Sequence, residues 1–214
     1  YQEVTGVQTC ALPIYMSHAF KSAVRKALGT PIIVADRFHF SRYIHWALER
    51  VRRRVQKDFH PYDRKKCKRM KHIFHKPYDQ LKDKQIWYLE RYLGLSEELR
   101  TAYALKEAYR LWFEEGKKMG PSAPEKVKEG LYNFYRKVEN AELKEFQQAI
   151  QTLKNWQIEI LNSFAFGYNN GFIEGLNNQT KVIKRNAFGF RRYDRFRLRV
   201  LLHHQYKLKG IHVG

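Results

Sequence analysis

Apolar residues recur at intervals of three and four along most of the chain, the spacing of helices that bury one face in a core. The clearest stripe begins at Phe40 and ends at Val55, with arginines on its other faces. The glycine and prolines of GPSAPEK, residues 120–126, interrupt the pattern and predict a break between helices. Helices are therefore expected at 17–29, 40–55, 79–93, 96–115, 131–138, 143–162 and 171–186.

One segment departs from this helical spacing. Residues 31–36, PIIVAD, form a compact β-branched apolar run that is typical of a buried strand. A single strand cannot form a sheet, so either its partner strands are missing or the run packs in another way. The pattern as a whole predicts a mainly α fold with one retained strand.

The aromatic residues mostly follow the same helical stripes. Tyr109 and Trp112 fall on one stripe, and Phe134 and Tyr135 fall on another. Aromatic residues at helical spacing belong to a packed core more often than to a base-stacking surface. We therefore assign them to the core.

The charge of the chain is strongly positive. Lysine and arginine number 41 against 21 aspartates and glutamates, a formal net charge of +20. Such a surface requires a polyanionic partner, and the 15% aromatic content favours a folded protein over a disordered tail. The charge run at 63–72, DRKKCKRMKH, is expected to be a solvated loop or helix end, with phosphate contact as the alternative. No apolar run approaches the roughly 18 residues of a membrane span, so we expect a soluble, cytoplasmic protein with no membrane partner.

The stretch VTGVQTCALPI, residues 4–14, fits neither a helix, a strand nor a signal peptide. Back-translated, it matches the reverse complement of a common short-read sequencing adapter, and we predict that residues 1–14 are not native. The adapter's next base, T, would begin the codon of Tyr15, turning a native GAT or GAC for Asp into Tyr. The alternative is a true leader or surface strand. Cys10 lies in this stretch, which leaves Cys67 without a disulfide partner, as is usual in the cytoplasm.

The helix expected at 171–186 carries the clearest candidate chemistry. Glu174, Asn177 or Asn178, Lys181 and Arg185 lie at spacings of three, four, seven and eleven, which places them on one face. A carboxylate, an amide and two cations on one face suit a site that holds a divalent metal beside a phosphate backbone. The alternative is that Glu174 is only a favourable residue in the first turn of a helix.

Several segments resemble bacterial insertion-sequence transposases of the ISL3 type. The run YNNGFIEGLNNQTKVIKRNAFGFRRYDRFRLRVLL, residues 168–202, is similar to the signature of that family. IIVADRFHF, residues 32–40, resembles its strand ending in Asp-Arg-Phe-His, and MSHAFKSAVRKALG, residues 16–29, resembles the helix before it. LRTAYALKEAYRLWF, residues 99–113, is similar to the helical insertion that these proteins carry. The resemblance covers essentially everything from residue 15 onward.

The resemblance implies a ribonuclease H-like fold in which two aspartates and a glutamate hold two divalent ions, Mg²⁺ or Mn²⁺. Glu174 matches the catalytic, metal-binding glutamate. The second aspartate of the family corresponds to Tyr15, and the first would lie on an upstream strand that is absent. We therefore expect a carboxy-terminal fragment that binds no metal stably and is inactive, derived from a transposase that cuts and joins DNA.

Further residues are assigned by the same resemblance. Asp36 and His39 form a D-x-x-H element that is expected to support the site, unless Asp36 only caps the following helix and His39 only packs. The candidate DNA-binding residues are Asn177, Asn178, Lys181, Lys184, Arg185, Arg191 and Arg192, followed by Arg195, Arg197 and Arg199.

The expected organisation is a truncated ribonuclease H-like α/β core interrupted by a large all-helical insertion. The core remnant is 15–57, the insertion is 58–160, and 161–214 holds the carboxy-terminal core helices with Glu174. The intact parent is expected to act on transposon ends and target DNA at the bacterial nucleoid, with a homodimer as one option for its assembly. The alternative function is a non-enzymatic basic helical protein that binds DNA or RNA, with a ribosome-associated RNA binder ranked below it. The lone strand would leave unpaired edges, so the isolated chain is expected to aggregate.

Overall fold

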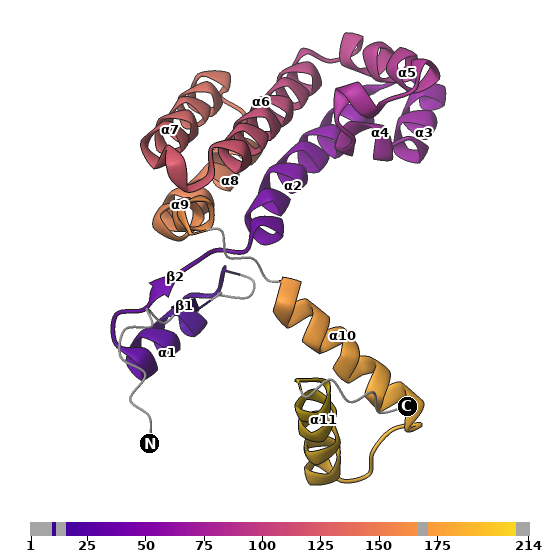
Figure 1. The fold of residues 1–214 in the computed structure, drawn as a ribbon. Helices are drawn as coiled ribbons and strands as arrows, with labels where there is room; N and C mark the ends of the chain where they lie inside the picture. Colours follow the sequence, from indigo (N-terminus) through magenta and orange to yellow (C-terminus); the bar gives the residue numbers. More distant parts are fainter. Residues whose placement is uncertain (1–9, 12–15, 167–170, 209–214) are drawn as a thin grey trace. The chain divides into compact units, whose positions relative to one another are not determined.

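The computed structural model describes residues 10–11, 16–166 and 171–208. They divide into two compact units, Tyr1–Tyr168 and Asn169–Gly214. The first unit contains the strands β1 (Cys10–Ala11) and β2 (Ile32–Ile33) and the helices α1 (His18–Leu28), α2 (Arg37–Val55), α3 (Pro61–Arg69), α4 (His72–His75), α5 (Asp83–Gly94), α6 (Glu97–Met119), α7 (Pro124–Ala141), α8 (Lys144–Asn155) and α9 (Gln157–Ala165) (Figure 1). The second unit contains α10 (Gly171–Asn186) and α11 (Tyr193–Leu208).

The ends of these helices follow local signals in the sequence. Asp36 caps α2, and the Ser96 hydroxyl caps α6 by accepting the Leu99 N–H at 3.2 Å. Gly120, with a φ of +52°, ends α6, and Pro124 begins α7. The break expected at GPSAPEK is therefore confirmed.

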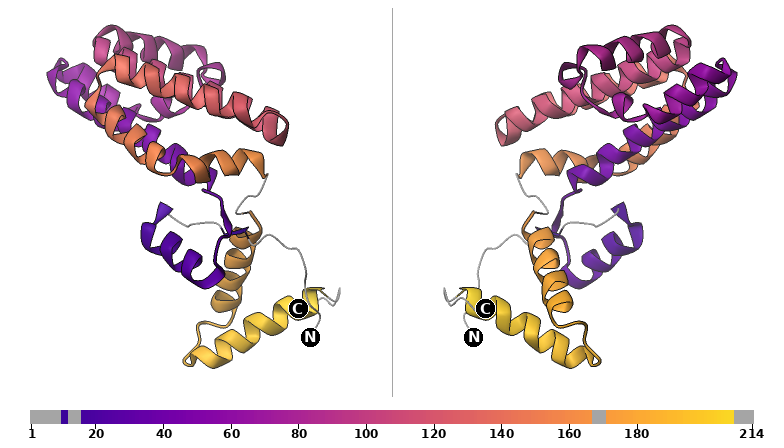
Figure 2. Two further views of the ribbon diagram at one scale, coloured as in Figure 1. Left: turned by 90° about the vertical axis from the view of Figure 1, so that its left-hand side faces the viewer. Right: turned by 90° about the vertical axis from the view of Figure 1, so that its right-hand side faces the viewer.

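The core of the first unit is formed by long helices. Helix α6 packs against both α2 and α7, and α8 packs against α2 (Figure 1, Figure 2). Tyr109 and Trp112 of α6 meet Phe134 of α7 and Phe164 of α9, with ring centroids 5.3 to 5.5 Å apart. All four rings are buried, which confirms that the aromatic stripes belong to the core.

Strand β2 is shorter than expected and is paired. In the structure Ile32 and Ile33 pair in parallel with Cys10 and Ala11, whereas the sequence predicted a lone strand over 31–36. The extended run stops early because the Ala35 N–H donates to the carbonyl of Glu159 at 2.9 Å and Asp36 then caps α2. Within the described residues the sheet consists of these two strands, so the mainly α class is confirmed.

Two other expectations about secondary structure were wrong. The charge run at 63–72 was expected to be a loop or helix end, but most of it lies within α3, which begins at Pro61 and buries Asp63 and Cys67. The single helix expected over 143–162 is divided into α8 and α9 at Trp156. Trp156 is buried and its ring lies 5.0 Å from that of His18, so packing against α1 favours the break.

Helix α10 matches the helix predicted at 171–186. It is joined to α11 through a turn in which Phe188 and Gly189 both have positive φ. None of the helices formed by the described residues is both long and apolar enough to cross a membrane.

Candidate active site and nucleic-acid interface

The Asp-Arg-Phe-His element lies at the start of α2. One oxygen of Asp36, Oδ1, accepts the N–H groups of Phe38 at 3.0 Å and His39 at 3.3 Å. His39 is half-buried, and its ring meets that of Phe38 edge-on at 5.6 Å. Asp36 therefore caps α2, which was one of the two roles considered for it from the sequence. A cap neither requires nor excludes a second role for this carboxylate.

This element is bound to α9. The Asn162 side chain donates to the carbonyl of Ile33 at 2.9 Å, and Arg37 donates to the carbonyl of Ser163 at 2.6 Å. The Arg37 guanidinium also lies 5.1 Å from the ring of Phe164, and burial lowers its pKa, an effect that Asp36 opposes. These contacts attach α9, the last helix of the first unit, to the Asp-Arg-Phe-His element.

Sequence reasoning missed a buried carboxylate beside this element. Glu159 of α9 is 2% exposed and forms an ion pair with Lys21 of α1. Lys21 also lies 5.0 Å over the ring of Trp156. An acidic residue between Ile158 and Ile160 was the available signal. This ion pair attaches α1 to α9, so the Glu159 carboxylate has a structural role.

The residues predicted for metal binding lie mostly outside the described part of the chain. Tyr15 is not among the described residues, and the structure describes the backbone of Glu174 and Asn177 in α10 but not their side chains. The helix places Glu174 in its first turn and keeps it on the face shared with Lys181 and Arg185. The metal-ligand assignment of Glu174 therefore stays a prediction.

The predicted DNA-binding side chains that the structure describes are on the surface of the second unit. Helix α10 exposes Asn178, Lys181, Lys184 and Arg185, and the segment through α11 exposes Arg191, Arg192, Arg195, Arg197 and Arg199. Arg192 forms two hydrogen bonds with Asp194, at 2.6 and 3.2 Å, which reduces the charge that it offers to a phosphate. The other cations carry positive charge along both helices.

A cavity of about 640 Å³ lies between α10 and α11. Val182, Ile183 and Leu202 supply its apolar lining, and Arg199 and His203 supply polar groups. The helix pair therefore combines an apolar hollow with a basic surface.

The described residues supply no cluster suited to a metal ion. Among them, no group of three or more His, Cys, Asp and Glu side chains could hold a metal ion. One Asp36 oxygen is committed to the cap of α2, and Glu159 is committed to Lys21. A two-ion site needs several carboxylates around the metals, which this set of donors does not supply.

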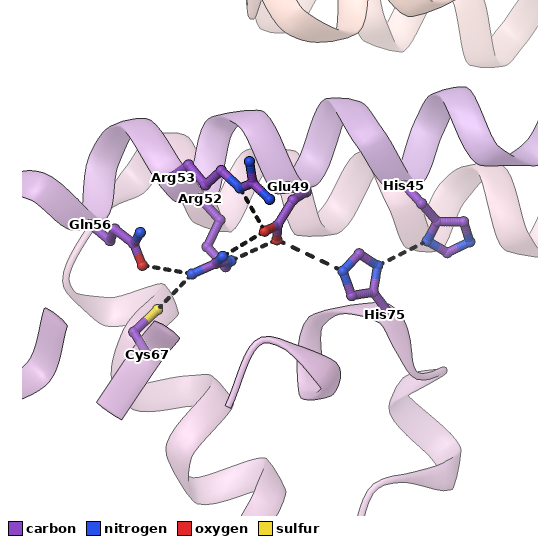
Figure 3. A network of polar contacts seen from close by, with 7 residues as sticks. All are labelled: His45, Glu49, Arg52, Arg53, Gln56, Cys67 and His75. Carbon is purple, nitrogen blue, oxygen red and sulfur yellow. Dashed lines mark hydrogen bonds and ion pairs between the residues drawn. The ribbon is translucent and has the colours of Figure 1, made fainter. Parts of the chain in front are cut away.

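A network of polar contacts lies between α2 and the segments α3 and α4 (Figure 3). Arg52 is 2% exposed and donates to both oxygens of Glu49 at 2.7 and 2.8 Å, to Gln56 at 2.6 Å and toward the Cys67 sulfur at 4.0 Å. Burial alone would raise the pKa of Glu49, but Arg52 and the exposed Arg53 outweigh it and lower that pKa to about 2.

Two histidines extend this network. The Nδ1 atoms of His45 and His75 lie 3.5 Å apart, and Nε2 of His75 is 3.8 Å from Glu49. Burial, followed by the charges of His75 and Lys106, lowers the pKa of His45 to about 4. Burial also lowers the pKa of His75, against the opposing charge of Glu49. Both imidazoles are therefore neutral near pH 7, and the network joins α2 to α3 and α4.

Comparisons with known proteins assign the family. The model of the DDE transposases of the ISL3 type, described as "Transposase", matches residues 11–200. The transposase for insertion sequence element IS1001 from Bordetella parapertussis is 28% identical over 196 residues, which are 89% of this chain and 46% of that protein.

A second relative matches a much shorter segment. A protein named ATP-dependent protease from Lactococcus lactis subsp. lactis is 41% identical over 59 residues, 28% of this chain and 19% of that protein. This match is too short to assign an activity, and no solved structure is significantly similar to the chain. The chain spans less than half the length of either relative. Because the family model matches nearly its whole length, the chain belongs to the DDE transposases of the ISL3 type.

Proposed function

We propose that this chain derives from a transposase that cuts and joins DNA by two-metal, in-line phosphodiester transfer during insertion-sequence transposition. The observation that carries the proposal is the family match over residues 11–200, which includes both the Asp-Arg-Phe-His element and the Glu174 helix. In the intact protein, Glu174 is the catalytic carboxylate, with a ribonuclease H-like core around it. Asp36 and His39 act as positioning residues beside it.

Two metal ions need more carboxylates than the family resemblance assigns to this chain. Of the three carboxylates that the family resemblance requires, it offers Glu174, while Tyr15 stands at the position of the second aspartate. The described donors add no group of three. We therefore propose that the 214-residue chain alone binds DNA without cleaving it.

DNA binding is assigned to the second unit. The exposed cations Lys181, Lys184 and Arg185 follow one another on the last turns of α10, and Arg195 and Arg197 stand on α11. Cations on a helix neutralise backbone phosphates and release counterions, so each contact adds about 0.9 to the logarithmic salt slope on duplex DNA. A homodimer of the intact protein and its location at the nucleoid are further parts of this proposal.

The test measures binding of the full chain to a labelled duplex by fluorescence anisotropy across a salt series. We expect the triple variant Lys181→Gln, Lys184→Gln, Arg185→Gln to bind more weakly and to reduce the slope by about 2.7. The matched control replaces three exposed lysines of the first unit, Lys117, Lys118 and Lys126, by glutamine. Equal effects of the two triple variants, or no binding by the unmodified chain at low salt, would contradict the proposal.

A nicking assay on supercoiled plasmid tests the second part. With Mg²⁺ or Mn²⁺ we expect no strand cleavage by the full chain. Metal-dependent nicking that disappears in Glu174→Gln would show that the chain assembles a working site, and the proposed inactivity would then be wrong.

A further inference from the structure

An aromatic and basic patch lies on the helical insertion, on α3 and α5. The patch consists of Tyr62 and Lys66 from α3 and Lys84, Trp87, Tyr88 and Arg91 from α5. The α5 residues are spaced at i, i+3, i+4 and i+7, and the α3 residues at i and i+4, so each set shares one helix face. The function proposed above does not use these residues.

Contacts between the two helices hold the patch in place. The Lys66 ammonium donates to the Tyr88 hydroxyl at 3.3 Å and lies 5.7 Å from the ring of Tyr62. Arg91 donates to both carboxylate oxygens of Asp63 at 2.9 and 3.0 Å, and its guanidinium lies 5.8 Å from the ring of Trp87. The rings and cations are therefore ordered before any ligand arrives, which lowers the entropic cost of binding.

The rings of this patch are exposed, unlike the aromatic residues of the core. The side chains of Tyr62 and Trp87 are each 59% exposed, whereas Trp112 and Trp156 are 6% and 2% exposed. Trp87 and Tyr88 meet edge to face, with centroids 4.9 Å apart at 84°. Packing inside this unit does not account for two large rings left in water.

The charge around the rings is positive. Arg64, Lys65, Lys68 and Arg69 of α3 are exposed beside the patch. One acidic residue at the patch, Asp63, is buried and paired with Arg91. Two acidic residues of α5, Asp83 and Glu90, are also exposed and lie four residues before and three residues after Trp87, so they adjoin its ring. The exposed cations of α3, with Lys66 and Lys84, outnumber them.

We propose that this patch binds single-stranded DNA, with bases stacked on Trp87 and Tyr62 and phosphates held by Lys66 and Lys84. An acidic protein would use the cations but not the rings, whereas a nucleic acid strand uses both. In a duplex each base is covered by its neighbours, so exposed rings can stack only on unpaired bases. The inference rests on the proposed function in taking DNA as the partner, and it adds a second site that prefers an unpaired strand.

The test compares Trp87→Ala with Trp46→Ala in the full chain. Trp46 is a matched control because it lies on α2, is 48% exposed and has the Arg42 guanidinium 4.4 Å from its ring. Binding is measured by fluorescence anisotropy with a labelled 20-nucleotide oligo(dT) and with a 20-base-pair duplex. Loss of one stacked base predicts that Trp87→Ala weakens binding of the single strand about five- to hundredfold. Duplex binding should change less than twofold, and Trp46→Ala should change neither.

Two further variants check the mechanism and the fold. Trp87→Phe keeps a ring and should recover most of the affinity, while Lys66→Gln should lower the salt slope on the single strand by about 0.7. Thermal unfolding of Trp87→Ala should match that of the unmodified chain, because the replaced side chain is exposed.

The outcomes separate this inference from the proposed function. If Trp87→Ala and Trp46→Ala behave alike, or if Trp87→Ala weakens duplex binding equally, the patch is not a single-strand site although the proposed function stands. If the unmodified chain binds neither DNA, the proposed function fails and this inference fails with it.

Discussion

Acidification from pH 7 to pH 5 should destabilise the first unit through His45. Burial, the charge of His75 and the charge of Lys106 lower the pKa of His45 from 6.5 in the unfolded chain to about 4 in the folded one. Below pH 6.5 His45 becomes protonated in the unfolded chain, whereas in the folded chain it becomes protonated only near pH 4. Because the unfolded state binds more protons in this window, stability falls as the pH falls.

The size of the effect follows from the two pKa values. At pH 7, His45 is nearly neutral in both states and contributes almost nothing. At pH 5 the unfolded state is favoured by about 2 kcal/mol from the linkage relation. His45 is only partly buried, so solvent screening reduces this to about 1 to 2 kcal/mol. His75, whose pKa is also lowered, acts in the same direction.

Urea unfolding followed by circular dichroism at pH 7 and pH 5 measures this loss. The matched variant is His45→Gln, which keeps a hydrogen-bonding group opposite His75 but does not titrate. We expect the variant to lose about 1 to 2 kcal/mol less than the unmodified chain between the two pH values. An equal loss in both proteins would show that His45 does not carry the acid sensitivity, and would refute the reasoning.

Three other predictions concern packing, capping and the origin of the chain. In Gly130→Ala the new Cβ would lie 2.6 Å from Cδ1 of Trp112, whose ring is held by a hydrogen bond to the Val127 carbonyl. The free energy of unfolding should therefore fall by about 1 to 3 kcal/mol, and an unchanged midpoint of thermal unfolding would contradict this. Asp36→Ala should cost about 1 kcal/mol by removing the cap of α2, whereas Asp36→Asn should cost almost nothing because Asn caps equally well; equal losses would contradict the capping account. Resequencing the source locus with an adapter-free method should give GAT or GAC at the codon for Tyr15, and a genomic TAT or TAC would refute the adapter hypothesis.

The sequence predicted the helices well where one face alone is apolar. Phe40, Ile44 and Val51 are buried along α2, and the predicted segment at 171–186 coincides with α10. The hydrophobic pattern gave wrong predictions for charged residues that the structure buries. The sequence placed Arg52 on an outer face of its helix, yet its side chain is buried. It can be buried because its guanidinium donates hydrogen bonds to Glu49 and Gln56 and toward the sulfur of Cys67 on α3.

The charge run at 63–72 misled the prediction for the same reason. Six lysines and arginines among ten residues favour a solvated segment, but Asp63 and Cys67, four residues apart, give α3 a buried face. Pro61 at the first helical position was the available signal of a helix start. The break at Trp156 could not be read from spacing, since it depends on the ring meeting His18 of α1, far away in the chain.

In the candidate site too, the sequence predicts relations within one helix but not contacts between separate segments. Spacing is enough to put Glu174, Lys181 and Arg185 on one face, because a helix fixes that relation within a few residues. A metal site instead depends on carboxylates contributed by separate segments, and helical spacing carries no information about which of them meet. Asp36 illustrates the difficulty, because its cap on α2 would favour an aspartate there with or without catalysis. The family match is therefore what supports a catalytic interpretation of these acidic residues, whereas the basic and aromatic surfaces can be tested on this chain directly.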